Sequence, residues 1–149
     1  MTLTSDSWTA LPPLPTPRDH HAVVAAAGRL HCIGGRVDGS YARNLNTHEV
    51  YDPATERWET KPALPTARSG IAAAVLSGKI FVVGGEAPSG TFGETEAFDP
   101  AANAWTSHAR MPTPRHGLGA ATVAGRLYVI AGGPSPGGSA SVVNEVLTL

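Results

Sequence analysis

The sequence predicts an all-β fold assembled from repeated four-stranded antiparallel units. The apolar runs are only four to seven residues long and are separated by glycine and proline, which is typical of short strands. No segment shows an apolar stripe with the period of a helix. One sequence pattern also occurs three times, because Trp58 follows Trp8 by 50 residues and Trp105 follows Trp58 by 47.

Each repeat opens with a fixed segment between a tryptophan and an arginine. The arginine follows the tryptophan by ten residues and comes directly after a Pro-Thr-Pro or Pro-Thr-Ala triplet, at Trp8–Arg18, Trp58–Arg68 and Trp105–Arg115. A stretch of small apolar residues follows and ends at a glycine, which predicts a first strand and a tight hairpin turn. These stretches are residues 22–27, 72–77 and 119–124, and the turn glycines are Gly28, Gly78 and Gly125.

The second predicted strand is more apolar and is followed by glycines. Its ranges are 29–33, 79–83 and 126–130, and the glycines are Gly34-Gly35, Gly84-Gly85 and, with one change, Ala131-Gly132-Gly133. We expect a glycine pair here to let a neighbouring backbone approach closely. His31 and Cys32 align with apolar or aromatic residues of the other repeats, which predicts buried packing roles for both.

The third and fourth predicted strands follow a loop of variable sequence. The third strand carries a glutamate and leads into an Asp-Pro turn at Asp52-Pro53 and at Asp99-Pro100. The fourth strand carries the next tryptophan. The predicted organisation is therefore one domain, residues 1–149, with a lone strand of the fourth type at 7–11 and repeats at 18–60, 68–107 and 115–149, the last of which lacks its own fourth strand.

A strand ending in a glycine pair, a variable loop, an aromatic-Asp-Pro turn and a tryptophan five residues after the proline together resemble the kelch repeat. The resemblance extends from Trp8 to Leu147. Kelch proteins fold as β-propellers, so the resemblance implies one four-stranded antiparallel blade per repeat around a central axis. Small residues in the first strand suit the crowded axis, and tryptophan suits the outermost strand, where blades diverge.

Three blades are expected to be too few to close a propeller, because each would have to turn by a third of a circle. The strand at 7–11 has no blade of its own, and the last repeat has no fourth strand. We therefore expect a homodimer that forms a six-bladed ring by strand exchange, in which each chain's first strand completes the partner's last blade. The alternatives are a nine-bladed trimer and a piece of a longer propeller.

Candidate ligand contacts are residues near the channel mouth that the resemblance implies, chiefly those that differ between repeats. One group is at the start of each first strand, and the other is in the loops before the third strands. Arginine and aromatic side chains in these groups are of the types that interfaces favour. The candidates are Arg18, Asp19, His20, Arg68, Ser69, Arg115 and His116 in the first group, and Arg36, Tyr41, Arg43, Glu86 and Phe92 in the second.

The three arginines of the first group also have a structural interpretation, which we favour. They recur in every repeat, and so do three glutamates of the third strands. Because buried charges need partners, this recurrence predicts an Arg–Glu contact within or between blades. The residues concerned are Arg18, Arg68 and Arg115 with Glu49, Glu96 and Glu145.

Neither a metal nor a cofactor is expected from the sequence. His20 and His21 are adjacent and would point to opposite faces of a strand. Asp19 and His116 could hold an ion only if they converged with the same residues of a second chain. Galactose oxidase is a related copper enzyme with a tyrosine–cysteine link, but Cys32 aligns with two valines, which indicates a buried apolar position instead.

The remaining alternative is a small-molecule enzyme. Sialic acid mutarotases resemble kelch propellers, and Asp19, His116, Glu86 and Arg36 could in principle transfer protons in a similar way. No nucleophile–base pair, paired-carboxylate motif or phosphate-binding loop stands out. The resemblance therefore favours a non-enzymatic binding module that presents a protein, peptide or carbohydrate site at one channel mouth.

Composition bears on partners and location. The formal net charge of −1 argues against a dedicated nucleic-acid binder. The longest apolar runs are too short to cross a membrane, and the first eight residues do not read as a signal peptide. A single cysteine excludes an intrachain disulfide framework and fits the cytoplasm, and the excess of arginine over lysine suggests a GC-rich bacterial genome.

Overall fold

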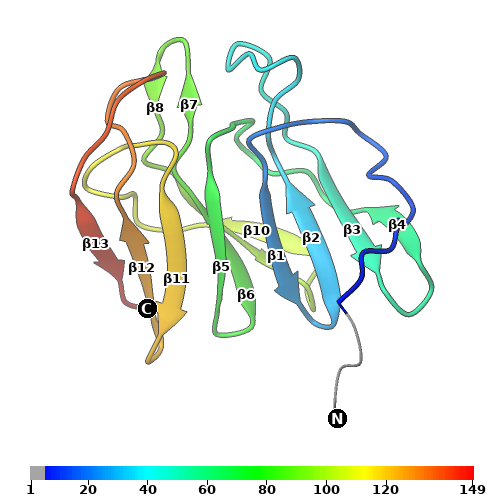
Figure 1. The fold of residues 1–149 in the computed structure, drawn as a ribbon. Helices are drawn as coiled ribbons and strands as arrows, with labels where there is room; N and C mark the ends of the chain where they lie inside the picture. Colours follow the sequence, from blue (N-terminus) through cyan, green and yellow to red (C-terminus); the bar gives the residue numbers. More distant parts are fainter. Residues whose placement is uncertain (1–5) are drawn as a thin grey trace.

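The computed structural model describes residues 6–149, which form thirteen strands and no helix (Figure 1). The first sheet has the order β1 (Ala22–Ala26), β2 (Arg29–Ile33), β3 (His48–Asp52) and β4 (Arg57–Thr60). The second has the order β5 (Ala72–Leu76), β6 (Lys79–Val83), β9 (Thr95–Asp99) and β10 (Ala104–Ser107). The third has the order β11 (Gly119–Val123), β12 (Arg126–Ile130) and β13 (Asn144–Leu147). All pairings are antiparallel, as the sequence predicts.

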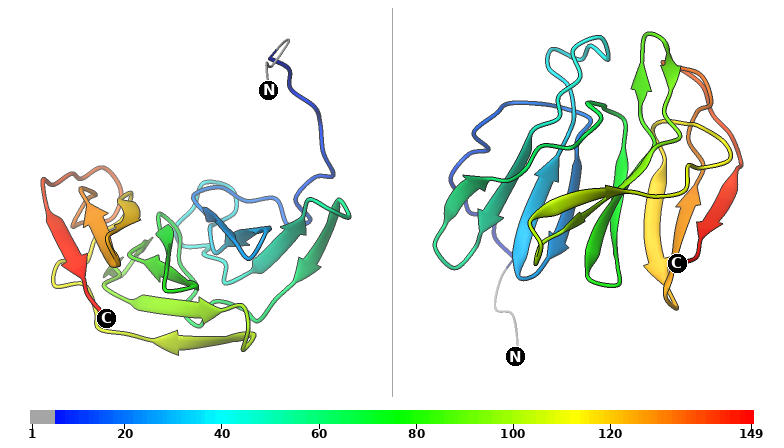
Figure 2. Two further views of the ribbon diagram at one scale, coloured as in Figure 1. Left: turned by 90° about the horizontal axis from the view of Figure 1, so that it is seen from below. Right: turned by 180° about the vertical axis from the view of Figure 1, so that it is seen from behind.

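The three sheets stand side by side along an open arc (Figure 2). Strand β5 lies against β1 on one side and against β11 on the other, so the first strands of the three sheets are neighbours. Alanine and glycine dominate these strands, which allows the close approach. Strands β4 and β10 lie on the outside of the arc.

Two apolar cores fill the spaces between the sheets. The core between the first and second sheets includes Ile33, Ile80 and Phe98, and the core between the second and third includes Phe81 and Leu127. The second sheet is therefore covered on both faces. Burying such side chains contributes roughly 1.5–3 kcal/mol each, so packing between sheets is the main stabilising contribution to this fold.

The hairpins between first and second strands have the predicted turn glycines. Gly28, Gly78 and Gly125 all have positive φ, and so does the residue before each of them, such as Ala27 with φ 49°. Two successive residues of positive φ define the type I′ turn, whose twist matches that of the flanking strands. The predicted Asp-Pro turns are also present, because Asp52 Oδ1 and Asp99 Oδ1 accept backbone hydrogen bonds from Ala54 and Ala101, both at 2.9 Å.

The glycine pairs permit the predicted close approach. A Cβ atom added to Gly34 would lie 2.8 Å from the carbonyl oxygen of Arg68, and one added to Gly84 would lie 2.5 Å from that of Arg115. Both contacts join one sheet to the next. Ala131 occupies the corresponding position of the third sheet and also has positive φ, at 58°.

The predicted strand at residues 7–11 does not form in the single chain. These residues belong to no sheet, and Trp8 is fully exposed. The physical reason is that a strand needs a hydrogen-bonding neighbour, and the matching edge at β13 lies at the other end of the arc (Figure 2). One element was not predicted: β7 (Glu86–Ala87) and β8 (Gly90–Thr91) form a small hairpin inside the second variable loop.

Candidate functional site

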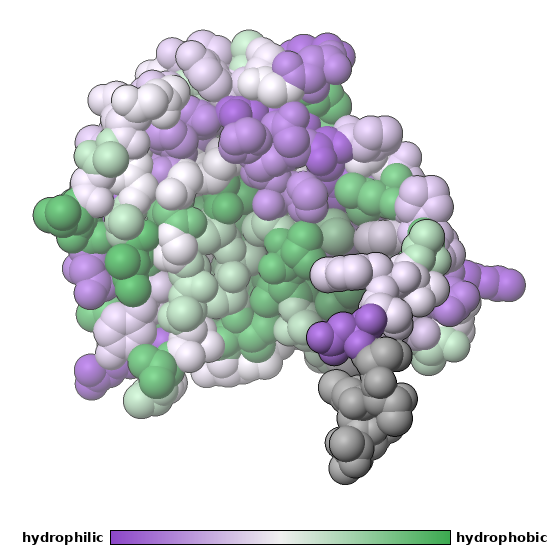
Figure 3. All heavy atoms as spheres, viewed as in Figure 1, coloured by the Kyte–Doolittle hydropathy of each residue, from purple (hydrophilic) through white to green (hydrophobic). Residues whose placement is uncertain are grey.

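The same backbone arrangement occurs at one end of all three sheets. The residue after each repeated arginine forms an isolated antiparallel bridge with a residue after the second strand: Asp19 with Arg36, Ser69 with Glu86, and His116 with Gly133. We call these six residues, together with His20 and the loop 37–44, the rim. Hydrophilic side chains gather at this end of the molecule, above a more apolar region (Figure 3).

Hydrogen bonds between sheets hold the rim together. The amide of Gly70 donates to the carbonyl of His20 at 2.9 Å, and the amide of Gly117 donates to the carbonyl of Gly70 at 2.8 Å. All three residues have positive φ, which is 52° at His20. Glycine adopts this conformation without strain, whereas a histidine does so at a cost of about 1–3 kcal/mol. A strained side chain kept at a surface position makes His20 a functional candidate.

The repeated arginines are bound to glutamates of the same sheet, as the favoured interpretation predicts. Arg18 Nη1 lies 2.6 Å from Glu49 Oε2, Arg115 Nη1 lies 2.5 Å from Glu145 Oε2, and Arg68 forms the same pair with Glu96. Each arginine also donates to a carbonyl of the second strand, such as Val82 at 3.1 Å from Arg68 Nη2.

The surroundings of Glu49 and Glu145 lower the pKa of both carboxyl groups and so favour their charged forms. Burial raises the pKa of Glu49, but hydrogen bonds from Thr16 and Arg18 outweigh burial, and the net pKa lies below its ordinary value. Burial lowers the pKa of Arg68, against the opposing effect of Glu96. The side chains of all three arginines are inaccessible to solvent, so these three sequence-predicted site residues offer no donor to a ligand in this structure. Their role is to position the rim residues that follow them.

A row of ionisable side chains crosses the rim, from Asp19 before β1 to His116 before β11. Arg36 Nε lies 3.1 Å from Asp19 Oδ1, and Arg36 Nη1 lies 2.8 Å from Glu86 Oε1 in β7. The other oxygen of Glu86 accepts a hydrogen bond from the amide of Gly137 at 2.7 Å and lies 3.5 Å from His116 Nε2. Arg36 and Glu86 are nearly covered, with side-chain exposures of 9% and 3%.

Asp19 is the solvent-accessible end of this row of side chains. Its side chain is 45% exposed, and its oxygens are also contacted by His20 Nδ1 at 2.6 Å and by the amide of Gly39 at 3.1 Å. The hydrogen bond to His20 is the main reason that the pKa of Asp19 is lowered. Asp19 is therefore a stable carboxylate that faces solvent.

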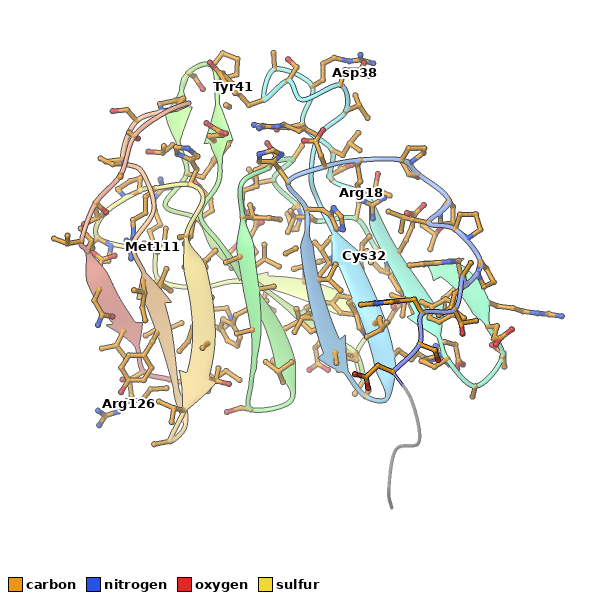
Figure 4. All side chains as sticks on the ribbon, viewed as in Figure 1. Arg18, Cys32, Asp38, Tyr41, Met111 and Arg126 are labelled. Atoms are coloured by element: carbon orange, nitrogen blue, oxygen red, sulfur yellow. The ribbon has the colours of Figure 1, made fainter. Side chains whose placement is uncertain are left out.

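An open groove runs beside Asp19. It has a volume of about 590 Å³ and is lined by residues 16–19 together with Val37, Asp38 and Arg43. Arg43 and Asp38 form an exposed ion pair, and Figure 4 shows Asp38 and Tyr41 at the same end of the molecule. The guanidinium of Arg36 lies 5.8 Å from the centre of the Tyr41 ring.

The other predicted rim residues are mostly covered. Ser69 is buried, and its hydroxyl has no hydrogen-bond partner among the described residues. His116 is also buried, with its ring nitrogens 3.1 Å and 2.8 Å from the carbonyls of Gly133 and Gly137. Phe92 is half-buried at the end of the β7–β8 hairpin. The structure thus brings Asp19, His20, Arg36, Glu86 and His116 together.

Some contributors to the rim were not found from the sequence. Asp38 lines the groove and pairs with Arg43, and the backbone of Gly137 completes the contacts of Glu86. The sequence signal for the Arg36–Glu86 pair was available, because opposite charges stand at the same offset in successive repeats. No comparable signal identifies Gly137, which contributes through its amide alone.

The described part of the chain shows no group of three or more histidine, cysteine, aspartate or glutamate side chains that could hold a metal ion. Cys32 is buried, and burial raises the pKa of its thiol. Within residues 6–149 there is also no helix of the length and apolar character needed to cross a membrane.

Antiparallel sheets side by side along an arc, with arginine–glutamate pairs and glycine pairs at fixed offsets, define an all-β repeat protein. The family model for the KLHDC2/KLHL20/DRC7 Kelch-repeats domain matches residues 1–149, and the chain therefore belongs to the kelch-repeat family. Kelch-repeat domains are typically protein-interaction scaffolds. No curated protein matches the chain.

Proposed function

We propose that each of the three sheets is one propeller blade and that the chain is a non-enzymatic interaction module whose ligand binds at the rim. The observation that carries this proposal is the groove beside Asp19. It combines an accessible carboxylate with the exposed Asp38–Arg43 pair on a rim that hydrogen bonds between sheets hold in place. Binding groups on loops that a rigid scaffold supports are a common arrangement for recognition.

The rim suits binding better than proton transfer. Arg36 and Glu86 are covered and neutralise one another, so neither is presented to a substrate as a free acid or base. His116 is held by two carbonyl groups. These three residues, which the mutarotase alternative requires, support the rim instead.

A polypeptide segment with a basic side chain is the ligand class that the groove favours. Asp19 offers a charged acceptor at the surface, and a lysine or arginine of the ligand would form a charge-assisted hydrogen bond with it. The Asp38–Arg43 ion pair is exposed and therefore contributes little to stability. Either member can leave the pair and bind a second charged group of the ligand. Sugar binding usually exploits an open aromatic face, whereas Tyr41 is partly covered and lies close to Arg36.

Selection of a displayed random-peptide library on the purified protein tests this function. We expect enrichment of peptides that carry lysine or arginine, and we expect Asp19→Asn to weaken the selected peptides at least about tenfold. Arg126→Ala is the matched control, because Arg126 is exposed at the opposite end of the molecule (Figure 4).

Two results would contradict the proposal. One is the absence of any enriched sequence. The other is equal binding by wild type and Asp19→Asn when both variants melt at the same temperature. Interconversion of sialic acid anomers by the wild type, followed by NMR and lost in Glu86→Gln, would favour the enzyme alternative.

A further inference from the structure

Trp105 of β10 occupies a defined slot at the boundary of the first and second sheets. The centre of its ring system lies 5.3 Å from that of Phe98 in β9 and 5.7 Å from that of His48 in the first sheet. Its Nε1 donates to the carbonyl of Pro62 at 2.8 Å. The slot thus has an aromatic floor from its own sheet, a wall from the preceding sheet and a backbone acceptor between them.

Trp58 of β4 makes the corresponding contacts one repeat earlier. It packs on Tyr51 at 5.1 Å between ring centres, and its Nε1 donates to the carbonyl of Pro12 at 3.0 Å. In both slots the acceptor follows the preceding tryptophan by four residues, since Pro12 follows Trp8 and Pro62 follows Trp58 by that number. One rule therefore positions both tryptophans.

The third sheet carries a slot of the same design. The rule predicts Ala109 as the acceptor, Leu147 as the floor and Thr95 as the wall, because these residues align with Pro62, Phe98 and His48. All three line a cavity of about 220 Å³, whose other walls include Met111, Leu127 and Val129. Strand β13 has β12 on one side and no strand on its other side among the described residues.

The outward faces of the first and third sheets also carry exposed apolar side chains. The aligned side chains are buried where a sheet packs against a neighbouring sheet. Leu30 of the first sheet is 39% exposed, although the aligned Ile80 of the second sheet is completely buried. Ile130 of the third sheet is 49% exposed, although the aligned Ile33 is completely buried. The end sheets therefore carry the residues of an inter-sheet core on faces that no part of residues 6–149 covers.

The chain cannot fill the third slot with its own Trp8. The hydrogen bond from Trp58 to Pro12 holds that residue against the first sheet, and four residues of extended chain span only about 14 Å. Strand β13, which borders the slot, lies at the far end of the arc (Figure 2). Trp8 is fully exposed and has the same sequence relationship to Arg18 as the two tryptophans that occupy slots.

We propose that residues 7–10 of a second copy of this chain pair with β13 and insert Trp8 into the cavity beside Ala109 and Leu147. The indole Nε1 donates to the carbonyl of Ala109, and the exposed faces of the end sheets meet. The exchange is reciprocal, so two chains form one ring of six sheets with a two-fold axis. This proposal is independent of the ligand at the rim.

The register of the exchanged strand follows from the two strands already in place. Trp58 pairs with Tyr51 and Trp105 with Phe98, and the residue after each tryptophan pairs with Val50 or Ala97. By the same register Trp8 of the partner subunit pairs with Leu147, and the partner's Thr9 pairs with Val146. Paired residues on adjacent strands lie within reach of a disulfide.

Cross-linking tests both the partner and the register. Two single-cysteine chains, Thr9→Cys and Val146→Cys, are prepared in a Cys32→Ser background and mixed under oxidising conditions. We expect a disulfide-linked species of twice the 15.3 kDa chain mass. Val142→Cys mixed with Thr9→Cys is the control, because Val142 is more exposed than Val146 but lies outside β13; this pair should give at least about tenfold less product.

Light scattering after gel filtration tests the indole slot. We expect wild type to elute at twice the chain mass and Trp8→Ala to weaken association at least about 30-fold, as for a central interface tryptophan. Val142→Ala is the control for loss of an exposed apolar side chain. A folded monomer of wild type, a three-chain species, or a dimer that tolerates Trp8→Ala and gives no cross-link would each overturn the proposal.

Discussion

Arg36 Nη1 lies 2.8 Å from Glu86 Oε1, and this ion pair joins the segment after β2 to the β7–β8 hairpin. Both side chains are nearly covered, and removal of one member of a buried pair leaves an uncompensated charge. We expect Glu86→Gln to lower the free energy of unfolding by about 3 kcal/mol, measured by urea denaturation.

The exposed pair of Arg43 and Asp38 is the natural control for that measurement. Solvent screens this pair, and Asp38→Asn should change the free energy of unfolding by less than about 1 kcal/mol. If Glu86→Gln had an effect as small as Asp38→Asn, the rim would not depend on the Arg36–Glu86 pair.

The Arg68–Glu96 pair should be still less tolerant of change. Arg68 is fully buried, and Glu96 also accepts a hydrogen bond from Thr66 at 2.8 Å. Glu96→Gln should destabilise the protein by about 3–5 kcal/mol. Glu59→Gln, at an exposed pair with Arg29, serves as the comparison, and a melting temperature of Glu96→Gln equal to that of Glu59→Gln would argue against a structural role for the pair.

We expect the free energy of unfolding to fall as the pH is lowered, because burial lowers the pKa of two histidines, His31 and His48. His31 Nδ1 lies 2.9 Å from His48 Nε2, and burial, with a smaller effect of His31, lowers the pKa of His48 from 6.5 to about 4. The unfolded chain therefore takes up the proton first as the pH falls. This contribution is complete above pH 6.5 and is lost progressively toward pH 4, by about 3 kcal/mol in total.

Denaturation midpoints measured between pH 7 and pH 5 test this prediction, because most carboxylates titrate below that range. His48→Thr, which copies the aligned Thr95 of the second sheet, should flatten the pH dependence. A slope unchanged in His48→Thr would assign the effect to other groups.

His20→Gly should separate stability from binding. His20 has φ 52°, and the aligned Gly70 and Gly117 share its conformation. Relief of the left-handed strain, offset in part by the larger loss of chain entropy at a glycine, should raise the free energy of unfolding by about 1 kcal/mol. The same change removes the imidazole beside Asp19, so binding of the rim-selected peptides should weaken; a variant that becomes more stable and binds as well as wild type would show that His20 serves no ligand.

Most of the fold was predictable because aligned positions of the three repeats can be compared with one another. The positions of Gly28 and Asp52, the strand order and the pairing of Arg18 with Glu49 all follow from residues that recur at fixed offsets. The β7–β8 hairpin and the amide of Gly137 were not predictable, because they belong to loops that differ in every repeat. The strand at 7–11 stays a prediction: its sequence is that of a fourth strand, and its pairing depends on an edge that the single chain does not bring near.

The candidate site was predictable in location but less so in the role of each residue. Position in the repeat placed Asp19, Arg36 and Glu86 together. It could not distinguish the accessible Asp19 from the covered Glu86, because exposure depends on how loops such as 134–141 fold over the rim. Sequence position likewise included Arg68 among the ligand candidates, although its side chain points into the sheet.

We call each contact between successive sheets a joint. In the proposed six-sheet ring, the joint at Ala131 should be packed less closely than the joints within one chain. At the two joints within the chain the corresponding residues are Gly34 and Gly84, and a Cβ at either would meet a carbonyl oxygen of the next sheet at 2.8 Å or 2.5 Å. Ala131 carries that Cβ and holds φ at 58°. In the ring its methyl group would face the corresponding carbonyl of the partner and hold the two sheets apart.

Ala131→Gly should therefore tighten the dimer about tenfold, measured as the dissociation constant by analytical ultracentrifugation. Ala124→Gly is the matched control, because Ala124 also has positive φ, at 49°, but belongs to the hairpin turn before Gly125 and not to a joint. Both substitutions relieve similar backbone strain, and only the first removes a methyl group from the interface. Equal dissociation constants for the two variants would mean that the third sheet does not meet its neighbour as the first two sheets meet theirs.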